Sequence, residues 1–348
     1  MDSLSEFDII KRYFSFANTP HQLSNAHTLV GIGDDAAVID TDNKPLVVAT
    51  DTLIEGVHFP PEFLAEHVAS RAMGVNLSDF AAMGATPRWM TMALSLSHVE
   101  PTWLAAFSQS LAQLCRQYNV TLIGGDTTKI DRGLVVSLTI MGETQSDSGL
   151  CLRRSGAQVG DDVWVSGALG KGAGALQLLM PTKDVAQWAC NDNDRAELLS
   201  SFYAPEPRLD LGSQLVGVAS AAIDISDGLI ADACHIASQS QVKIIIEGDA
   251  LPIHKGLVTN ANCQQVQQWV LSGGDEYELL FTAAANQTAA IQSLSSSLSL
   301  PCTRIGSVVE GADVAVQGKG WDINKFSRYF KQSFLCQFTR HKHRVEKV

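Results

Sequence analysis

The chain has 348 residues, a formal net charge of −12, 45% hydrophobic residues and 18% charged residues. This length and balance predict a globular protein of about two domains with a large buried core. The acidic balance argues against a surface that binds nucleic acid duplexes, because phosphate contacts need clustered Lys and Arg. An acidic protein can still bind phosphates through metal ions.

The N-terminus and the cysteines favour a cytoplasmic protein. The first residues, MDSLSEFDIIKRYF, include acidic side chains and lack the apolar run and cleavage site of a secretory signal. No later run is long and apolar enough for a membrane span. The seven cysteines are scattered singly, which favours reduced thiols over disulfides or a zinc site.

The first half, residues 1–152, is expected to form a mixed α/β domain. Its expected elements are a helix over 4–16, strands at 36–39 and 46–49, helices at 65–83 and 101–118, and strands at 120–123 and 134–141. Two of these strands are expected to end in a carboxylate, at Asp51 and Asp126. Asp79 lies in a mostly apolar helix, where a carboxylate loses hydration unless it is paired.

The second half, residues 153–330, is also expected to be α/β, with a basic, solvated tail at 331–348. Its expected elements are strands at 163–165, 221–224, 242–246, 279–282, 304–309 and 314–316, and helices at 229–237, in the Gln-rich stretch, and at 288–298. The glycine-rich run at 166–174 is not a Walker A loop, because that motif needs Gly at Val165 and a hydroxyl at Gly172. A strand-to-helix turn with small residues for close packing is favoured, although its amides could still meet phosphate.

Adjacent carboxylates stand out at Asp34 and Asp35, on a glycine-flanked turn. Two such charges 4 Å apart repel by about 4 kcal/mol at an effective dielectric near 20, which predicts a cation or hydrogen-bond donors nearby. The alternative is a solvated surface turn. For Asp227 the alternative is an N-cap of the following helix, which leaves Asp224 unexplained.

The acidic residues as a set predict a magnesium site. None of them has a His or Cys neighbour at ligand spacing, and all-oxygen ligation suits Mg²⁺ or Mn²⁺. We therefore expect several Mg²⁺ ions held against a polyphosphate. The set consists of Asp34, Asp35, Asp51, Asp79, Asp126, Asp224 and Asp227.

Seven motifs in the chain resemble those of thiamine-monophosphate kinases, in the family's order. They are GIGDDA (31–36), TDTLIEGVHF (50–59), NLSDFAAMGA (76–85), IGGDTT (123–128), RSG (154–156), IDISDGL (223–229) and SGGDEYEL (272–279). The resemblance implies the two-domain α/β (α+β) fold of the aminoimidazole ribonucleotide synthetase superfamily, in which the N-terminal sheets pair across a homodimer. It also implies a kinase that converts ATP and thiamine phosphate to ADP and thiamine diphosphate.

Position by position, the resemblance implies three groups of contacts. Its magnesium positions are Asp35, Thr50, Asp51, Asp79, Asp126, Asp224 and Asp227, with Asp34 beside them. Its ATP contacts are Gly125, Asp126, Arg154 and Ser226, and its thiamine phosphate contacts are His58, Asp275 and Trp321. By residue type alone, His58 can instead be a loop histidine, Arg154 a surface cation and Trp321 a core aromatic.

The chain departs from the commonest family pattern at three places. Asp275 and Glu276 stand where many members have Glu and then Asp, so Asp275 is expected to contact substrate, with Glu276 the alternative. Ala49 stands where relatives often have Ser, so only its carbonyl could ligate a metal. Lys171 stands where an acidic residue is usual, and it either adds a phosphate contact or alters a surface turn.

The expected mechanism is direct in-line transfer without a covalent nucleophile. A phosphate monoester is mostly a dianion at pH 7 and needs no general base to attack. The alternatives are another ATP-dependent enzyme of the superfamily, either an amidine-forming ligase or a selenophosphate synthetase, and a non-catalytic nucleotide-binding protein. The synthetase would need a reactive Cys near the N-terminus, whereas the first Cys here is Cys115.

Overall fold

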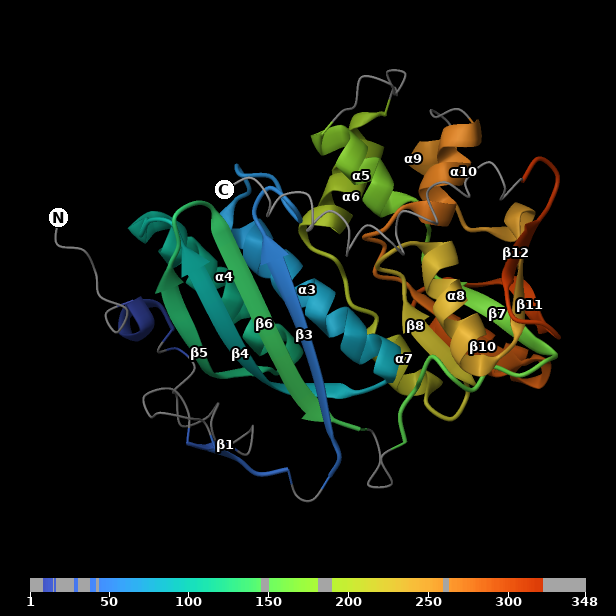
Figure 1. Ribbon diagram of the computed structural model, residues 1–348, viewed down its shortest axis with the longest axis horizontal. Helices are drawn as coiled ribbons and strands as arrows, with labels where there is room; N and C mark the ends of the chain where they lie inside the picture. Colours follow the sequence, from blue (N-terminus) through green and yellow to red (C-terminus); the bar gives the residue numbers. More distant parts are fainter. Residues whose placement is uncertain are drawn as a thin grey trace, which may run out of the picture. The chain divides into compact units, whose positions relative to one another are not determined.

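The computed structural model describes residues 9–14, 16, 28–30, 38–41, 44–144, 150–180, 190–258 and 263–321 (Figure 1). The Asp34-Asp35 motif and the basic tail lie outside the described residues. The chain divides into two compact units, Met1–Cys151 with Tyr203–Ser213, and Leu152–Phe202 with Gln214–Val348. The expected bounds place Tyr203–Ser213 in the second domain, whereas this segment belongs to the first compact unit. The domain bounds of 1–152 and 153–330 stay predictions.

The first unit contains a four-stranded sheet, a small two-stranded sheet and helices. Its elements are η1 (Ile10–Phe14), β1 (Thr28–Val30), β2 (Val38–Ile39), β3 (Leu46–Ile54), α3 (Ala65–Met83), β4 (Thr86–Leu96), α4 (Pro101–Tyr118), β5 (Thr121–Lys129) and β6 (Leu134–Glu143). The large sheet has the order β3-β6-β4-β5, with only β4 and β5 parallel. Helix α3 packs against β3, β6 and β4, and α4 packs on α3 (Figure 1).

Both long helices confirm the sequence predictions, because their apolar spacing and end signals agree. Helix α4 begins at Pro101, and the carboxylate of Glu100 accepts the backbone N–H of Thr102 at 3.2 Å. Helix α3 ends at Gly84, which has a left-handed backbone with φ of 63°.

Two predicted strand ends are wrong. Strand β3 continues to Ile54 and β5 to Lys129, so Asp51 and Asp126 lie within strands and not at their ends. Strand β4 was not predicted, although it lies between β6 and β5. A register shift between Pro87 and Trp89 interrupts its alternation and hides the strand period.

The second unit is built on a six-stranded sheet with the order β12-β9-β11-β7-β10-β8, in which only β12 and β9 pair in parallel. Its strands are β7 (Asp161–Ser166), β8 (Ala221–Asp224), β9 (Lys243–Glu247), β10 (Leu279–Ala284), β11 (Cys302–Val309) and β12 (Val314–Gln317). Its helices are α5 (Lys171–Leu179), α6 (Asp192–Tyr203), α8 (Leu229–Ser240), η3 (Gly248–Ala250), α9 (Lys255–Val258), α10 (Cys263–Ser272), η4 (Ala285–Gln287) and α11 (Thr288–Ser297). Helix α7 (Leu209–Leu215) spans the point where the chain leaves the first unit.

Helix α8 covers much of this sheet, since it contacts β8, β9, β10 and β12, and α10 packs on α8 and α5. The turn from β7 into α5 confirms the strand-to-helix interpretation of the glycine-rich run. Within the described part of the chain, we find no helix with both the length and the apolar character needed to cross a membrane.

Candidate active site

Asp51 lies in the middle of β3, at the free edge of the large sheet. Its backbone N–H donates to Oδ1 of Asn76 at 3.0 Å, and Nδ2 of Asn76 donates to the carbonyl of Ala72 at 3.1 Å. Asn76 is 1% exposed and thus fixes the strand edge to α3. Burial raises the pKa of Asp51, and His58 acts in the opposite direction. Asp79 is half-buried, one turn further along α3.

His58 lies in the turn that follows β3. The backbone N–H of Ile54 donates to its Nδ1 at 2.9 Å, so the neutral imidazole carries its proton on Nε2. The carbonyl of His58 accepts a hydrogen bond from Nε of Arg71 at 3.2 Å. Arg71 is 2% exposed, so it anchors the turn from inside α3. His58 is therefore held in one orientation with a defined tautomer.

Asp126 lies on the opposite face of the sheet from Asp51. It is exposed and in register with Ala93, Ser137 and Thr52 along one transverse row. Thr50 lies on this same face, where its hydroxyl is 2.9 Å from that of Thr139. A Cβ on Gly125 would lie 2.0 Å from the carbonyl oxygen of Met92, so glycine is required there by close packing.

The end of β8 carries Asp224, which is 4% exposed, and leads into the ISDG loop (residues 225–228). The backbone N–H groups of Ser226, Asp227 and Gly228 all donate to Oδ2 of Asp232, each at 3.1 Å. Burial raises the pKa of Asp232 to about 8, and the charges of Asp224 and Asp227 add to the shift. The alternative role of Asp227 as an N-cap is not observed, because Gly228 is the N-cap residue of α8 and no side chain caps it.

The GGDEYE segment (residues 273–278) runs beside the ISDG loop. The N–H of Asp275 donates to the carbonyl of Ser226 at 2.9 Å, and that of Tyr277 donates to the carbonyl of Ile225 at 2.9 Å. Asp275 and Tyr277 both have left-handed backbones, with φ of 62° and 52°. The phenol of Tyr277 donates to Oδ1 of Asp275 at 2.8 Å, which orients that half-exposed carboxylate.

Glu276 occupies the N-terminus of α5, where phosphate binding was left open by the sequence. Its carboxyl oxygens accept the backbone N–H groups of Gly170, Lys171 and Gly172 at 2.9, 3.2 and 3.3 Å. These amides therefore bind a side chain of the protein itself. Nζ of Lys171 lies 2.7 Å from Oε1 of buried Glu278.

Arg154 and Trp321 occupy two further places in the second unit. Arg154 is exposed, and its carbonyl accepts the hydroxyl of Ser240 at 3.1 Å. Trp321 is half-buried, donates from Nε1 to Oδ1 of Asp249 at 3.1 Å, and lies against Gly248, where a Cβ would lie 2.4 Å from its ring.

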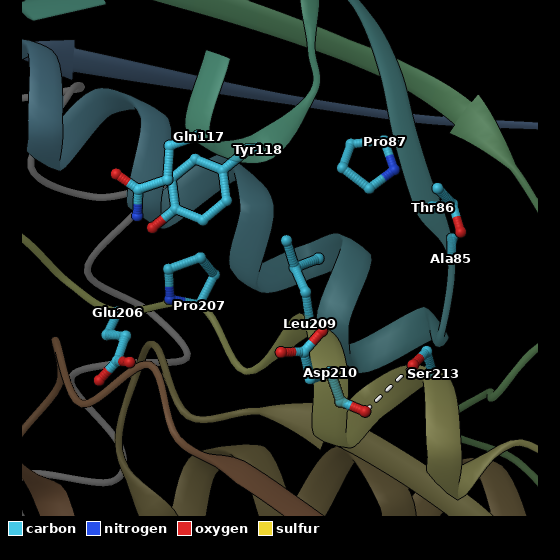
Figure 2. A pocket seen from close by; sticks show the side chains of 10 residues that line it. All are labelled: Ala85, Thr86, Pro87, Gln117, Tyr118, Glu206, Pro207, Leu209, Asp210 and Ser213. Carbon is cyan, nitrogen blue, oxygen red and sulfur yellow. Dashed lines mark hydrogen bonds between the residues drawn. The ribbon is translucent and has the colours of Figure 1, made fainter. Parts of the chain in front are cut away.

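A hollow of about 570 Å³ lies in the first unit (Figure 2). Gln117 and Tyr118 of α4 face Glu206 and Pro207 across it in the view, and Leu209 and Asp210 lie nearby (Figure 2). None of the sequence-predicted site residues is among the residues that line it. The hollow is therefore not formed by the residues predicted to bind the metal, ATP or thiamine phosphate.

Comparisons with known proteins decide the family. The AIR synthase related protein N-terminal domain matches residues 33–144, and the AIR synthase related protein C-terminal domain matches residues 158–319. A thiamine-monophosphate kinase of Haemophilus influenzae is 40% identical over 309 residues, which cover 88% of this chain and 90% of that protein. The chain belongs to the thiamine-monophosphate kinase family.

Two solved structures of this family have the same fold. Thiamine-monophosphate kinase from Stenotrophomonas maltophilia K279a is 43% identical to this chain. The match covers 91% of this chain and 98% of that one, with a TM-score of 0.80. The structure of AaThiL complexed with AMPPCP and TMP is 32% identical, covers 92% and 95%, and has a TM-score of 0.68. These likenesses confirm the predicted resemblance and the two-domain fold of the thiamine-monophosphate kinase family.

The structure of this family member places the predicted residues in two groups. Thr50, Asp51, His58, Asp79, Gly125 and Asp126 belong to the first unit, and Arg154, Asp224, Ser226, Asp227, Asp275 and Trp321 to the second. Within the described residues of either unit, no three His, Cys, Asp or Glu side chains converge on one point as metal ligands. The donors fit Mg²⁺ by type, because they are oxygens.

Sequence reasoning did not find the structural roles of Asn76, Asp232 and Glu276. It named Glu276 only as a possible substrate contact, not as an acceptor for the N-terminal amides of a helix. Asn76 accepts a backbone N–H from β3, Asp232 accepts from the loop before its helix, and Glu276 accepts from the start of α5. A polar side chain inside an apolar helix was a usable signal for Asn76 and Asp232. For Glu276, the only signal was its place beside the predicted substrate carboxylate.

Proposed function

We propose that this chain transfers the γ-phosphoryl group of ATP to the phosphate of thiamine monophosphate, giving ADP and thiamine diphosphate. The observation that carries the proposal is similarity to thiamine-monophosphate kinases over most of the chain, one of them solved with AMPPCP, an ATP analogue, together with TMP. The seven sequence motifs support the same reaction. ATP and thiamine monophosphate are thus the proposed co-substrate and substrate.

The proposed chemistry is direct in-line transfer between two anions. The acceptor phosphate is already an adequate nucleophile at neutral pH, so no side chain has to form a covalent intermediate. The protein's task is to position the acceptor and the nucleotide and to exclude water. His58, with its proton on Nε2, is suited to donate a hydrogen bond to a phosphate oxygen.

We further propose that several Mg²⁺ ions are held by Asp35, Thr50, Asp51, Asp79, Asp126, Asp224 and Asp227, with Asp34 beside them. When bound, Mg²⁺ neutralises phosphate charge that would otherwise repel these carboxylates. Burial raises the pKa of Asp51, and a nearby cation would offset the cost of its desolvated charge.

For the nucleotide we propose contacts with Gly125, Asp126, Arg154 and Ser226, and for thiamine monophosphate contacts with His58, Asp275 and Trp321. Asp275 is favoured over Glu276, because the carboxyl group of Glu276 is buried on three backbone amides. A carboxylate suits the amino group or the cationic ring of thiamine better than its phosphate.

We also propose that the protein acts in the cytoplasm as a homodimer. The face of the large sheet opposite α3 exposes Leu46, Val48 and Ile54 by 42%, 55% and 38%. An exposed apolar sheet face of this kind suits a second copy of the same sheet. ATP as co-substrate supports the cytoplasmic location.

A coupled assay of ADP release tests the proposed reaction. With ATP and Mg²⁺, we expect ADP release with thiamine monophosphate and none with unphosphorylated thiamine. Removal of divalent ions with EDTA is expected to abolish turnover, and Mg²⁺ to restore it. Tight ATP binding without any ADP release would instead favour a non-catalytic nucleotide-binding protein, and turnover only with a purine intermediate would favour a ligase.

A further inference from the structure

The GGDEYE segment alternates between buried and solvent-facing side chains. Glu276 and Glu278 are 6% and 0% exposed, whereas Asp275 and Tyr277 between them are half-exposed. The two half-exposed residues are the two with left-handed backbones. Such a conformation is strained for a non-glycine residue and persists only where surrounding contacts impose it.

Glu276 provides the first of these contacts. Its carboxyl group accepts three consecutive N–H groups at the start of α5, whose N-cap residue, Gly170, has no side chain to do so. The backbones also meet closely, since a Cβ on Gly172 would lie 2.2 Å from the carbonyl oxygen of Gly274. The segment is therefore fastened directly to the helix end.

The Lys171–Glu278 ion pair provides the second contact. Nζ of Lys171 lies 2.7 Å from Oε1 of Glu278, and the hydroxyl of Ser166 donates to Oε2 at 2.6 Å. The lysine side chain is 15% exposed and that of Glu278 is 1% exposed, so the pair is largely shielded from solvent. Lys171 thereby neutralises one of two acids buried side by side.

We propose that Glu276 is a positioning residue for thiamine monophosphate, and that the Lys171–Glu278 pair supports it. By fastening the GGDEYE segment to α5, it keeps Asp275 turned toward the substrate, with the Tyr277 hydroxyl orienting the carboxylate. This inference rests on the proposed function, in which Asp275 contacts thiamine monophosphate.

Replacement of the side chain separates positioning from mere support of the fold. Glu276→Ala is expected to raise the KM for thiamine monophosphate at least tenfold while the KM for ATP changes less than twofold. Glu276→Gln keeps one carbonyl acceptor and is expected to recover most of this loss. Glu310→Gln, at an exposed glutamate, is the matched control with unchanged kinetics. Equal rises in both KM values, or none in either, would contradict the proposal.

A double-mutant cycle then asks whether Glu276 acts through Asp275. In an Asp275→Ala background, Glu276→Ala is expected to change the KM for thiamine monophosphate by less than twofold, because the oriented carboxylate is already absent. Independent, multiplicative effects would show that Glu276 acts by another route and would overturn the proposal. Should Glu276→Ala not fold, Lys171→Met takes its place in the cycle, with a smaller rise expected.

Assays of the wild-type protein distinguish a failure of the proposed reaction from a failure of the positioning role. If it releases no ADP with thiamine monophosphate, the proposed function fails. If it is active and Glu276→Ala keeps the wild-type KM for thiamine monophosphate, the positioning role alone fails.

Discussion

At the scale of single residues, Asp232 and Glu276 perform the same physical task in different places. Each is a buried carboxyl group that accepts three consecutive backbone N–H groups, which would otherwise lack partners. Asp232 is 2% exposed and holds the loop that carries Ser226 and Asp227. The loop's shape therefore depends on a residue that has no proposed contact with substrate.

Loss of the Asp232 carboxyl group is expected to weaken that loop more than the fold. In Asp232→Ala, three N–H groups lose their acceptor, so we expect kcat/KM for ATP to fall at least tenfold. The free energy of unfolding is expected to fall by about 1–3 kcal/mol, the usual cost of unsatisfied buried donors. Steady-state ADP release and urea unfolding measure the two effects. Asp192→Asn, at an exposed residue of α6, is the control. Wild-type kinetics in Asp232→Ala would contradict the assignment.

The pH dependence of stability follows from Glu276. Burial raises its pKa to about 8 from an ordinary value of 4.5, so the folded state retains a proton that the unfolded state releases. The folded protein should therefore lose stability relative to Glu276→Gln as pH rises from about 4.5 to about 8, and the difference should be constant above that. Urea unfolding of both proteins across this range provides the measurement. A difference that does not vary with pH, or that grows in favour of the wild type, would disagree with burial as the dominant cause.

At the scale of elements, the sequence predicts helices better than strand limits. The helices at 65–83 and 101–118 were predictable because their apolar periodicity and end residues agree. Strand β4 was not predicted, because its bulge places Trp89 and Met90 side by side in the core and breaks the period of two. The ends of β3 and β5 were misplaced because glycines and carboxylates usually terminate strands, whereas here they continue within them.

The candidate site was predictable as a set of positions but not as a geometry. The acidic residues could be named from motifs, since those motifs lie in one order along the chain. Which carboxylates share a face could not, because strand register alone separates Asp51 from Asp126. The occupancy of the α5 amides by Glu276 likewise depends on a contact between residues more than a hundred positions apart.

The junction between α3 and β3 yields the next prediction. Asn76 accepts the N–H of Asp51 and donates to the carbonyl of Ala72 in the helix interior. Asn76→Ala removes both bonds in a buried place, so we expect the free energy of unfolding to drop by about 1–3 kcal/mol. Gln113→Ala on the exposed side of α4 is the control and should change it by less than about 0.5 kcal/mol. Urea unfolding tests both variants. An unchanged free energy of unfolding in Asn76→Ala would show that these hydrogen bonds do not stabilise the fold.

At the scale of the whole molecule, the exposed apolar side chains on the sheet face opposite α3 have the strongest consequence. The strand β3 alternates, with Asp51 and Leu53 on the side of α3 and with Val48, Thr50 and Ile54 on the other face. Among the described residues, helices cover only one side of this sheet. Apolar residues on an open face are costly in water, so a second copy is the proposed cover.

Substitution of Val48 by Asp tests that cover directly. The side chain is 55% exposed, so Val48→Asp should leave the single chain folded and place a charge in the middle of the proposed interface. We expect the wild type to sediment as a dimer and the variant as a monomer at the same concentration. Val159→Asp, at an apolar residue of the second unit that is 57% exposed, should remain dimeric. The variant should be monomeric because two buried carboxylates facing each other across a two-fold axis would repel each other. A monomeric wild type, or a Val48→Asp variant that still dimerises, would show that this face has another role.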